Sequence, residues 1–278
     1  MIKSLPKEQP MASRQKTRQK KSRKRKAIPN AAIKNKHASN TLSQHESVAL
    51  RTAEKRRKDF VERLSIDTAR SGIQPLYELM QESYSLFDSM LDDITLDPPL
   101  ACKRGCIYCC INQVSLTEPE ALYLGFHLLE TRSPSELQNL KDRTQTLLTE
   151  LKGKSREEIG MERHLHPCLF MEGETCSIYT ARPFVCRGWN SVNAEMCKHS
   201  NQSGDALAPI ENHPLPRIIA DSIQIGLLNG AKETSLETGY LLLPRAVYLL
   251  LENGVENITE LTENWLKGEA FFARGISI

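Results

Sequence analysis

The sequence lacks a long hydrophobic run. Its longest apolar stretch, residues 240–251, is interrupted by Pro244 and Arg245 and is too short to cross a bilayer. No apolar segment of signal-peptide length follows the basic N-terminus. We therefore expect no membrane partner and a cytoplasmic location, where cysteines stay reduced.

The sequence also lacks the glycine-rich loops with which many enzymes bind phosphates or nucleotides. Its glycines at positions 226, 230 and 239 are isolated, and we find neither a nucleophile with its base nor the cofactor loop of a methyltransferase. The sequence therefore leaves open whether the protein is an enzyme.

Acidic residues are scarce in the first part of the chain. Residues 1–58 contain 18 Lys or Arg and three acidic residues, whereas the remaining 220 residues contain 19 basic and 31 acidic residues. We expect residues 1–42 to form a disordered basic arm, because they have few apolar residues to bury and their charges repel. Residues 1–40 could bind RNA through its phosphates, or they could form a solubilising or targeting tail.

Helical periodicity dominates residues 43–278, which we expect to form one body. Apolar residues recur at helical spacing over residues 43–72 and 75–94. Capping boxes at Thr117 and Ser133 predict two more helix starts. Further helices are expected over residues 216–230, 244–252 and 258–266. No strand pattern is convincing, so the predicted fold class is mainly α, with a helical body around a cysteine-rich metal-binding region.

All eight cysteines lie within 96 consecutive residues. They are Cys102, Cys106, Cys109, Cys110, Cys168, Cys176, Cys186 and Cys197. Gaps of two or three residues in the first group let two sulfurs approach one ion, and Gly105 permits the necessary turn. We therefore predict eight metal ligands rather than a disulfide framework or inert thiols.

The ligand type limits the choice of metal. Thiolates favour zinc or an iron–sulfur cluster over magnesium or calcium. Since one tetrahedral ion accepts four thiolates, eight cysteines predict either two separate sites or one multinuclear site with bridging sulfur. The adjacent pair Cys109-Cys110 slightly favours the multinuclear site.

Residues beside the cysteines suggest how the centre is supported. We predict that Arg182 and Arg187 donate hydrogen bonds to the sulfurs or to nearby carbonyl groups. The alternative is that either arginine faces solvent beside an acidic partner. His164 and His166 are expected to lie in a solvated loop rather than to bind metal, and Trp189 is expected in the core.

The order of these sequence blocks resembles a known family. The pattern Cys102-x3-Cys106-x2-Cys109-Cys110 precedes five further blocks. These are Val114–Ala121, Pro167–Phe170, Cys176–Tyr179, Arg182-Pro183 and Cys186-Arg187. They are similar to the CxxCxxCC (YkgJ-like) cysteine-cluster proteins, described as zinc- or iron-chelating domains, a group that includes the flagellin N-methylases. The resemblance covers residues 102–198 and implies a metal centre, but it does not account for the basic arm.

Three functions are compatible with these observations. The first is an interaction module that has a structural zinc site and binds a protein partner. The second is an iron–sulfur redox or methyl-transfer enzyme. The third is an RNA-associated factor in which the basic arm binds phosphate and the metal region is a scaffold.

Overall fold

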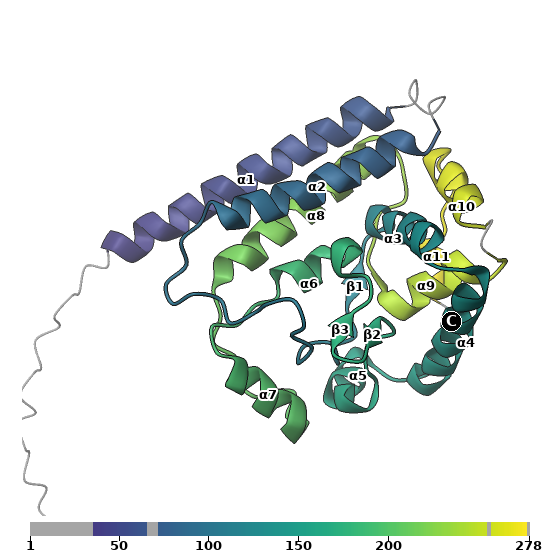
Figure 1. Ribbon diagram of the computed structural model, residues 1–278. Helices are drawn as coiled ribbons and strands as arrows, with labels where there is room; N and C mark the ends of the chain where they lie inside the picture. Colours follow the sequence, from purple (N-terminus) through teal and green to yellow (C-terminus); the bar gives the residue numbers. More distant parts are fainter. Residues whose placement is uncertain (1–35, 66–71, 255–256, 277–278) are drawn as a thin grey trace, which may run out of the picture.

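The computed structural model describes residues 36–65, 72–254 and 257–276, and it is mainly helical, as predicted (Figure 1). The first helix, α1 (Lys36–Leu64), begins inside the segment expected to be disordered. Residues 1–35 of the predicted basic arm lie outside the described residues. Among the described helices, none is both long enough and apolar enough to span a membrane.

Three long helices form one layer of the molecule. α1, α2 (Gln74–Asp92) and α8 (Pro214–Glu233) pack side by side and lie along the upper part of Figure 1. The buried positions of α2 recur three and four residues apart, which places them on one face of the helix. They are Leu76, Leu79, Met80, Ser83, Tyr84 and Phe87.

The contact between α1 and α8 depends on two glycines. A Cβ atom at Gly226 would lie 2.4 Å from the carbonyl oxygen of Ala53, and one at Gly230 would lie 2.4 Å from Cβ of Phe60. These glycines therefore let the two helices approach closely. The prediction that this helix ends at Asn229-Gly230 is wrong, because Gly230 serves this packing and α8 continues to Glu233.

A second group of helices lies below this layer. α3 (Glu118–Thr131) and α4 (Pro134–Leu151) begin at the predicted capping boxes of Thr117 and Ser133. Both contact α9, which also packs against the last two helices. The three C-terminal helices are α9 (Leu243–Leu251), α10 (Asn257–Leu266) and α11 (Phe272–Gly275). The helices predicted over residues 244–252 and 258–266 are thereby confirmed.

Short elements separate α4 from α8. They are α5 (Arg156–Met161), η2 (Arg163–Leu165), η3 (Tyr179–Ala181), α6 (Phe184–Gly188) and α7 (Ala194–Ser203). Four strands of two residues each form two antiparallel pairs: β1 (Ser115–Leu116) with β4 (Leu241–Leu242), and β2 (Met171–Glu172) with β3 (Thr175–Cys176). No sequence pattern predicts these elements. Most span too few residues to show a period, and α7, with 10 residues, is largely polar and buries Ser200 rather than an apolar face.

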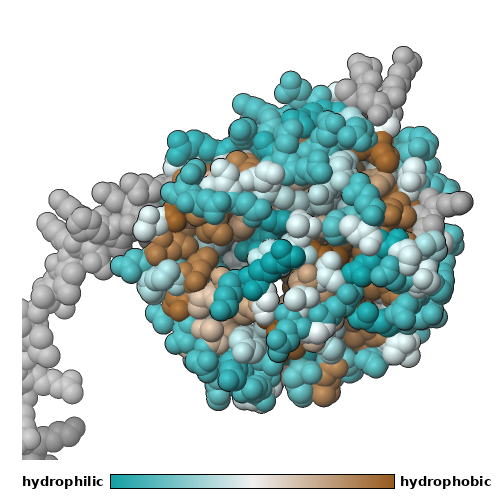
Figure 2. Space-filling model, in the orientation of Figure 1, coloured by the Kyte–Doolittle hydropathy of each residue, from teal (hydrophilic) through white to brown (hydrophobic). Residues whose placement is uncertain are grey.

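One apolar core joins the two groups of helices. Phe60 of α1 and Trp265 of α10 are both fully buried and meet edge to face, with ring centroids 6.4 Å apart. The surface of the upper layer is hydrophilic, whereas the face below it mixes hydrophilic and hydrophobic side chains around a hollow (Figure 2). The cysteines lie in this lower part, among the short elements.

Candidate metal centre

The first four cysteines lie on a loop of tight turns between α2 and β1. The N–H of Cys106 donates to the carbonyl of Lys103 at 3.0 Å, and that of Cys110 donates to the carbonyl of Ile107 at 2.8 Å. Gly105 makes the first turn possible, since its φ of 89° lies in the left-handed region that favours glycine. The loop therefore curls as the spacing of its cysteines predicts.

A backbone hydrogen bond joins this loop to the next cysteine. The N–H of Cys168 donates to the carbonyl of Cys110 at 2.7 Å. Cys168 precedes the β2–β3 hairpin, and Cys176 ends β3. The side-chain amide of Gln113 also donates to the carbonyl of His166 at 2.6 Å. Cysteines more than 50 residues apart in the sequence are thus brought together.

A buried glutamate positions the helix that carries Cys186. One Glu120 oxygen accepts the N–H and the hydroxyl of Thr117, each at 2.9 Å, which closes the capping box of α3. The other oxygen accepts the N–H of Phe184, the first residue of α6, at 2.7 Å. Gln224 of α8 donates a further bond at 2.8 Å. Glu120 therefore fixes α6 relative to α3 and α8.

The remaining cysteines are Cys102, at the start of the first loop, and Cys197, on α7. The Cys102 sulfur accepts the N–H of Ser191 at 3.3 Å. α7 carries Cys197 and begins at Asn193, whose side chain caps its first turn. The side chain of Asn201 in α7 donates to the carbonyl of Tyr108 at 3.1 Å. These bonds hold α7 against the cysteine loop.

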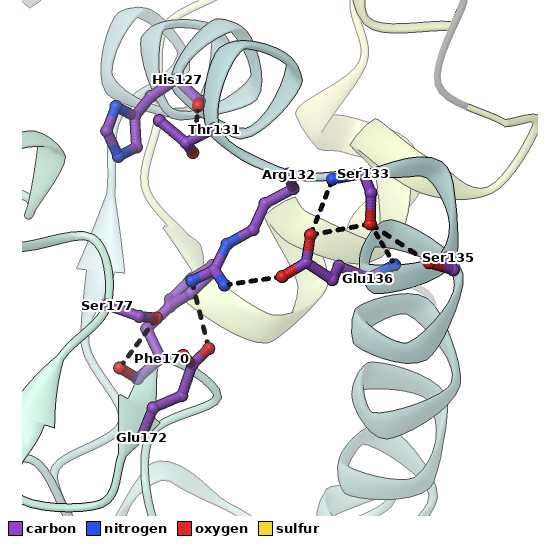
Figure 3. Close-up of polar contacts among 9 residues, drawn as sticks. All are labelled: His127, Thr131, Arg132, Ser133, Ser135, Glu136, Phe170, Glu172 and Ser177. Carbon is purple, nitrogen blue, oxygen red and sulfur yellow. Dashed lines mark hydrogen bonds and ion pairs between the residues drawn. The ribbon is translucent and has the colours of Figure 1, made fainter.

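Arg132 anchors the β2–β3 hairpin to the start of α4 (Figure 3). Its guanidinium lies 3.6 Å from Glu136 and 3.1 Å from Glu172 of β2. On the same hairpin, the hydroxyl of Ser177 donates to the carbonyl of Phe170 at 3.2 Å. The two carboxylates and the arginine thus connect the hairpin that bears Cys176 to the second group of helices.

Six of the eight cysteines line one cavity of about 390 Å³. They are Cys106, Cys109, Cys110, Cys168, Cys176 and Cys186. Apolar side chains make up much of the remaining wall, including Ile178 and Leu243. The two groups of cysteines that are separate in the sequence therefore face a common space.

Backbone N–H groups point at three of the sulfurs. Cys106, Cys168 and Cys176 accept hydrogen bonds from the N–H groups of Tyr108, Phe170 and Ile178, each two residues further on. Such bonds stabilise a thiolate over a thiol. They fit a site at which these sulfurs are deprotonated metal ligands.

Burial opposes ionisation while the thiols are unliganded. It raises the pKa of Cys168 to about 11 and that of Cys186 well above its ordinary value. For Cys109, a hydrogen bond with Cys110 and then burial raise the pKa well above the usual range. A metal ion must therefore displace protons from these cysteines.

Repulsion between thiolates indicates which cysteines are neighbours. Cys102 is influenced by Cys106, Cys109 and Cys197, whereas Cys186 is influenced by Cys168, Cys109 and Cys176. Cys109 belongs to both sets. Seven cysteines thus form two overlapping groups, and Cys110 joins them through its hydrogen bond with Cys109.

The cysteine sulfurs line the cavity but do not converge on a single position that a metal ion could occupy. Across residues 36–65, 72–254 and 257–276, no three Cys, His, Asp or Glu side chains are close enough to form a complete metal-binding group. The donor set nevertheless fits a soft metal, because it combines eight thiols with backbone N–H bonds to sulfur. The assignment of all eight cysteines as ligands remains a prediction, and it requires the loops to move closer together.

The two predicted supporting arginines occupy different places. Arg182 lines the cavity, and its charge offsets part of the rise in pKa that burial causes at Cys176 and Cys186 and that Cys110 and burial cause at Cys109. Arg187 instead donates to Asp88 at 2.8 Å and to the carbonyl of Thr180 at 2.5 Å. Arg187 also donates to the carbonyl of Arg182 at 3.2 Å, so the predicted bonds to nearby carbonyl groups are confirmed for this residue. It has an acidic partner as well, but its side chain is buried rather than facing solvent.

Two further predictions concern residues near the cysteines. His166 is buried and contacts Glu150 at 3.1 Å, instead of lying in a solvated loop. Trp189 was expected in the core, but it is 48% exposed and lines the cavity. Its position after the short helix α6, at the edge of the cavity, explains this exposure. No pattern in the sequence around these two residues indicates that His166 is buried or that Trp189 is exposed.

Arg143 is a supporting residue that sequence reasoning missed. It lies on α4, its charge offsets part of the burial that raises the pKa of Cys168, and it donates to the carbonyl of Leu169 at 2.6 Å. The cationic residues that the sequence places beside cysteines do not include it. Arg143 is 25 positions away from Cys168 in the sequence, so no local signal marked it.

Comparison with known proteins identifies one family. Residues 101–203 match the family model named CxxCxxCC, whose description is "Putative zinc- or iron-chelating domain". The match covers the cysteine loop, the hairpin and helices α3 to α7. No curated protein and no solved structure matches the chain.

Proposed function

We propose, from the match of residues 101–203 to the CxxCxxCC family model, that the eight cysteines hold a zinc or iron centre facing the cavity. The observation that carries this proposal is the gathering of six cysteines from two distant segments around one space. Backbone N–H bonds to three sulfurs and the nearby cations of Arg143 and Arg182 support the charge of a thiolate centre.

The cavity favours a centre that reacts with a ligand over a closed structural site. Structural zinc sites are enclosed by four protein ligands, whereas catalytic sites keep an open position. Here the space is larger than metal ions need, and Trp189 at its wall is half exposed. Zinc at such a centre would act as a Lewis acid. An iron–sulfur cluster would support redox or methyl-transfer chemistry.

Metal analysis of protein purified without air tests the proposal. Zinc in a colourless sample would assign a zinc centre. Iron with acid-labile sulfide and broad visible absorption would assign a cluster. Protein that contains no metal, and that takes up neither zinc nor iron after thiol reduction, would contradict the proposal.

Single substitutions identify the ligands. Cys106→Ser and Cys186→Ser change one cysteine from each overlapping group, and both should lower the metal content. His164→Ala is the matched control, because it removes an exposed imidazole near Cys168. Full metal content in both serine variants would contradict their assignment as ligands.

RNA association is a second candidate function, which the charge of the N-terminal part favours. Residues 1–58 contain 18 basic and three acidic residues. At the described end of this segment, Arg51, Lys55 and Lys58 are exposed on α1. Contacts between such basic side chains and RNA phosphates need no sequence-specific pocket.

Deletion of residues 1–40 tests RNA association. Binding to single-stranded RNA should fall steeply on deletion, and binding by the full chain should weaken as the salt concentration rises. The Cys186→Ser variant is the control, since it should retain RNA binding while it loses metal. Unchanged binding after the deletion would exclude the arm as the RNA-binding element.

A further inference from the structure

The cavity beside the cysteines has a cationic and an apolar part. Four arginines contribute to its lining: Arg156, Arg163, Arg182 and Arg217. Among the described residues that line it, none is an aspartate or glutamate. The six cysteines of the wall are neutral as thiols, and as metal ligands their charge is offset by the bound ion. The arginines, in a wall without a carboxylate, therefore favour an anionic ligand.

The four arginines are not equally available. Arg217 is paired with Asp221 at 2.8 Å. The Nη2 atom of Arg163 donates to Ser200 at 2.6 Å and to the carbonyl of Asp205 at 2.7 Å. The terminal nitrogens of Arg163 and the guanidinium of Arg217 are therefore committed to protein partners, although the Nε of Arg163 is buried without one. Arg156 is exposed to solvent.

Arg182 is available to a ligand. Its guanidinium lies over the ring of Tyr179, 4.2 Å from the ring centroid. Within the part of the chain that the structure describes, it forms no ion pair, and its Nε is buried without a hydrogen-bond partner. Stacking of one face leaves the N–H edge of a guanidinium free, and this edge matches a carboxylate.

The rest of the wall limits the body of the ligand. Ile159 and Ile178 are buried apolar residues of the lining, and the half-exposed ring of Trp189 lies at the same cavity. The volume of about 390 Å³ falls in the range of sites for small organic molecules. Apolar walls disfavour a strongly hydrated ion and favour a molecule with a hydrophobic body.

We propose that this cavity binds a small organic carboxylate, with its anionic group on Arg182 and its apolar body against Ile178 and Trp189. This proposal names the substrate class of the proposed metal centre and depends on that centre only for the reaction that follows binding. In the opposing interpretation, Arg182 serves only to balance the charge of the metal thiolates.

Two probes of similar shape separate these interpretations. Calorimetric titration of the metal-loaded full-length protein would compare naphthalene-acetate with naphthalene-ethanol, which has the same apolar body but no charge. We expect the acid to bind at least about tenfold more tightly than the alcohol. Equal affinity for the two probes, or no binding of the acid, would overturn the proposal.

Variants locate the anion. Arg182→Gln should reduce acid binding by about tenfold and leave alcohol binding within about twofold. Arg182→Lys should recover part of the loss. Arg63→Gln, which removes an exposed arginine on α1 paired with Glu82, is the matched control and should change neither affinity. An equal loss of acid binding in the Arg182→Gln and Arg63→Gln variants would contradict the assignment.

Fluorescence and metal content complete the test. Bound acid should quench Trp189 in the wild-type protein, and the quenching should disappear in Trp189→Phe, where only the fully buried Trp265 remains. Quenching that persists in this variant would place the probe elsewhere and overturn the proposal. Metal is measured separately on every variant, so absence of metal with selective acid binding would refute the metal centre alone.

Discussion

The α1–α2–α8 layer and the cysteine region, residues 101–117 and 166–203, are stabilised in different ways. In the layer, Phe60 and Leu79 are fully buried along long helices. In the cysteine region the longest helix, α7, has 10 residues, and the strands have two residues each. All eight cysteines keep some exposure. Apolar periodicity therefore determines the layer. The cysteine region buries some core residues, such as Phe170 and Phe184, but we expect it to depend also on the proposed metal.

The largest expected effect is that of metal removal, which should destabilise the cysteine region far more than the α1–α2–α8 layer. Chelation, or the double substitution Cys106→Ser with Cys186→Ser, should destabilise the cysteine region by on the order of 5 kcal/mol, because metal binding contributes to folding at such sites. Limited proteolysis should then cut within residues 101–117 or 166–203 while far-ultraviolet circular dichroism retains most of the helix signal. If the cysteine region resisted the protease equally with and without metal, the proposed difference between the two regions would be wrong.

Metal uptake should also release protons. Burial raises the pKa of Cys168 to about 11 and raises that of Cys186 well above its usual value, so these thiols are protonated at neutral pH before metal binds. Calorimetry in two buffers of different ionisation enthalpy measures the protons released. Uptake should weaken as the pH falls, and metal binding that is independent of pH would show that the ligands are not these thiols.

Gly230→Ala should break the layer instead. The new Cβ would lie 2.4 Å from Cβ of Phe60, so the two helices must separate, at a cost of about 3 kcal/mol. Gly160→Ala in α5 is the matched control, since no atom of the described residues outside its own helical turn and chain neighbours lies within 4 Å of its Cβ position. It should be neutral or stabilising by up to about 1 kcal/mol. Denaturant titration checks both, and a similar loss in the two variants would contradict the packing argument.

Glu118→Gln should reveal a buried acid between the two regions. Burial raises the pKa of Glu118 from 4.5 to about 8, so folding favours the protonated form and the wild-type protein loses stability as pH rises through this range. The variant does not titrate, and its stability relative to the wild type should therefore increase by about 2–4 kcal/mol between pH 5 and pH 9. Denaturant titrations across this range measure the difference.

Glu136→Gln is the control of opposite sign. Hydrogen bonds from Ser133 lower the pKa of this exposed carboxyl group, so its contribution to stability is present above pH 4.5 and is lost as pH falls further. The variant should be less stable than the wild type at neutral pH and approach it in acid. If the stability of both glutamine variants relative to the wild type changed with pH in the same direction, burial could not be the cause at Glu118 and hydrogen bonding the cause at Glu136.

The smallest effect is expected at the junction drawn in Figure 3. Ser133→Ala removes the hydroxyl that caps α4 and should cost about 1 kcal/mol. Metal content should not change, because Arg132 still joins Glu136 and Glu172. Thermal unfolding with metal analysis checks this outcome, and loss of metal would show that the cap itself positions the hairpin.

Much of the helical fold could be predicted because its signals are local. Thr117 and Ser133 begin helices where their capping boxes indicate. The end of α8 could not be predicted, since Gly230 resembles a helix stop unless its contact with Phe60 is known. Glycine is common both at the ends of helices and where two helices pack closely, so the sequence alone does not distinguish the two roles.

The cysteine cluster was evident from spacing, but its surroundings were not. Arg143 and Trp189 take part in the site through tertiary contacts that leave no pattern near the cysteines. The role of Glu120 was predicted only in part. Its capping box was foreseen, whereas its bonds to Phe184 and Gln224 depend on how α3, α6 and α8 pack.

The bonds of Glu120 have a consequence for how this domain can be exchanged between proteins. The family match ends at residue 203, yet Gln224, which completes the partners of Glu120, lies beyond it. The same is true of β4, the partner of β1. A transplanted segment 101–203 would carry a buried acceptor and an unpaired strand into its new host. The matched segment is therefore shorter than the unit that folds, and a host protein would have to supply equivalents of α8 and β4.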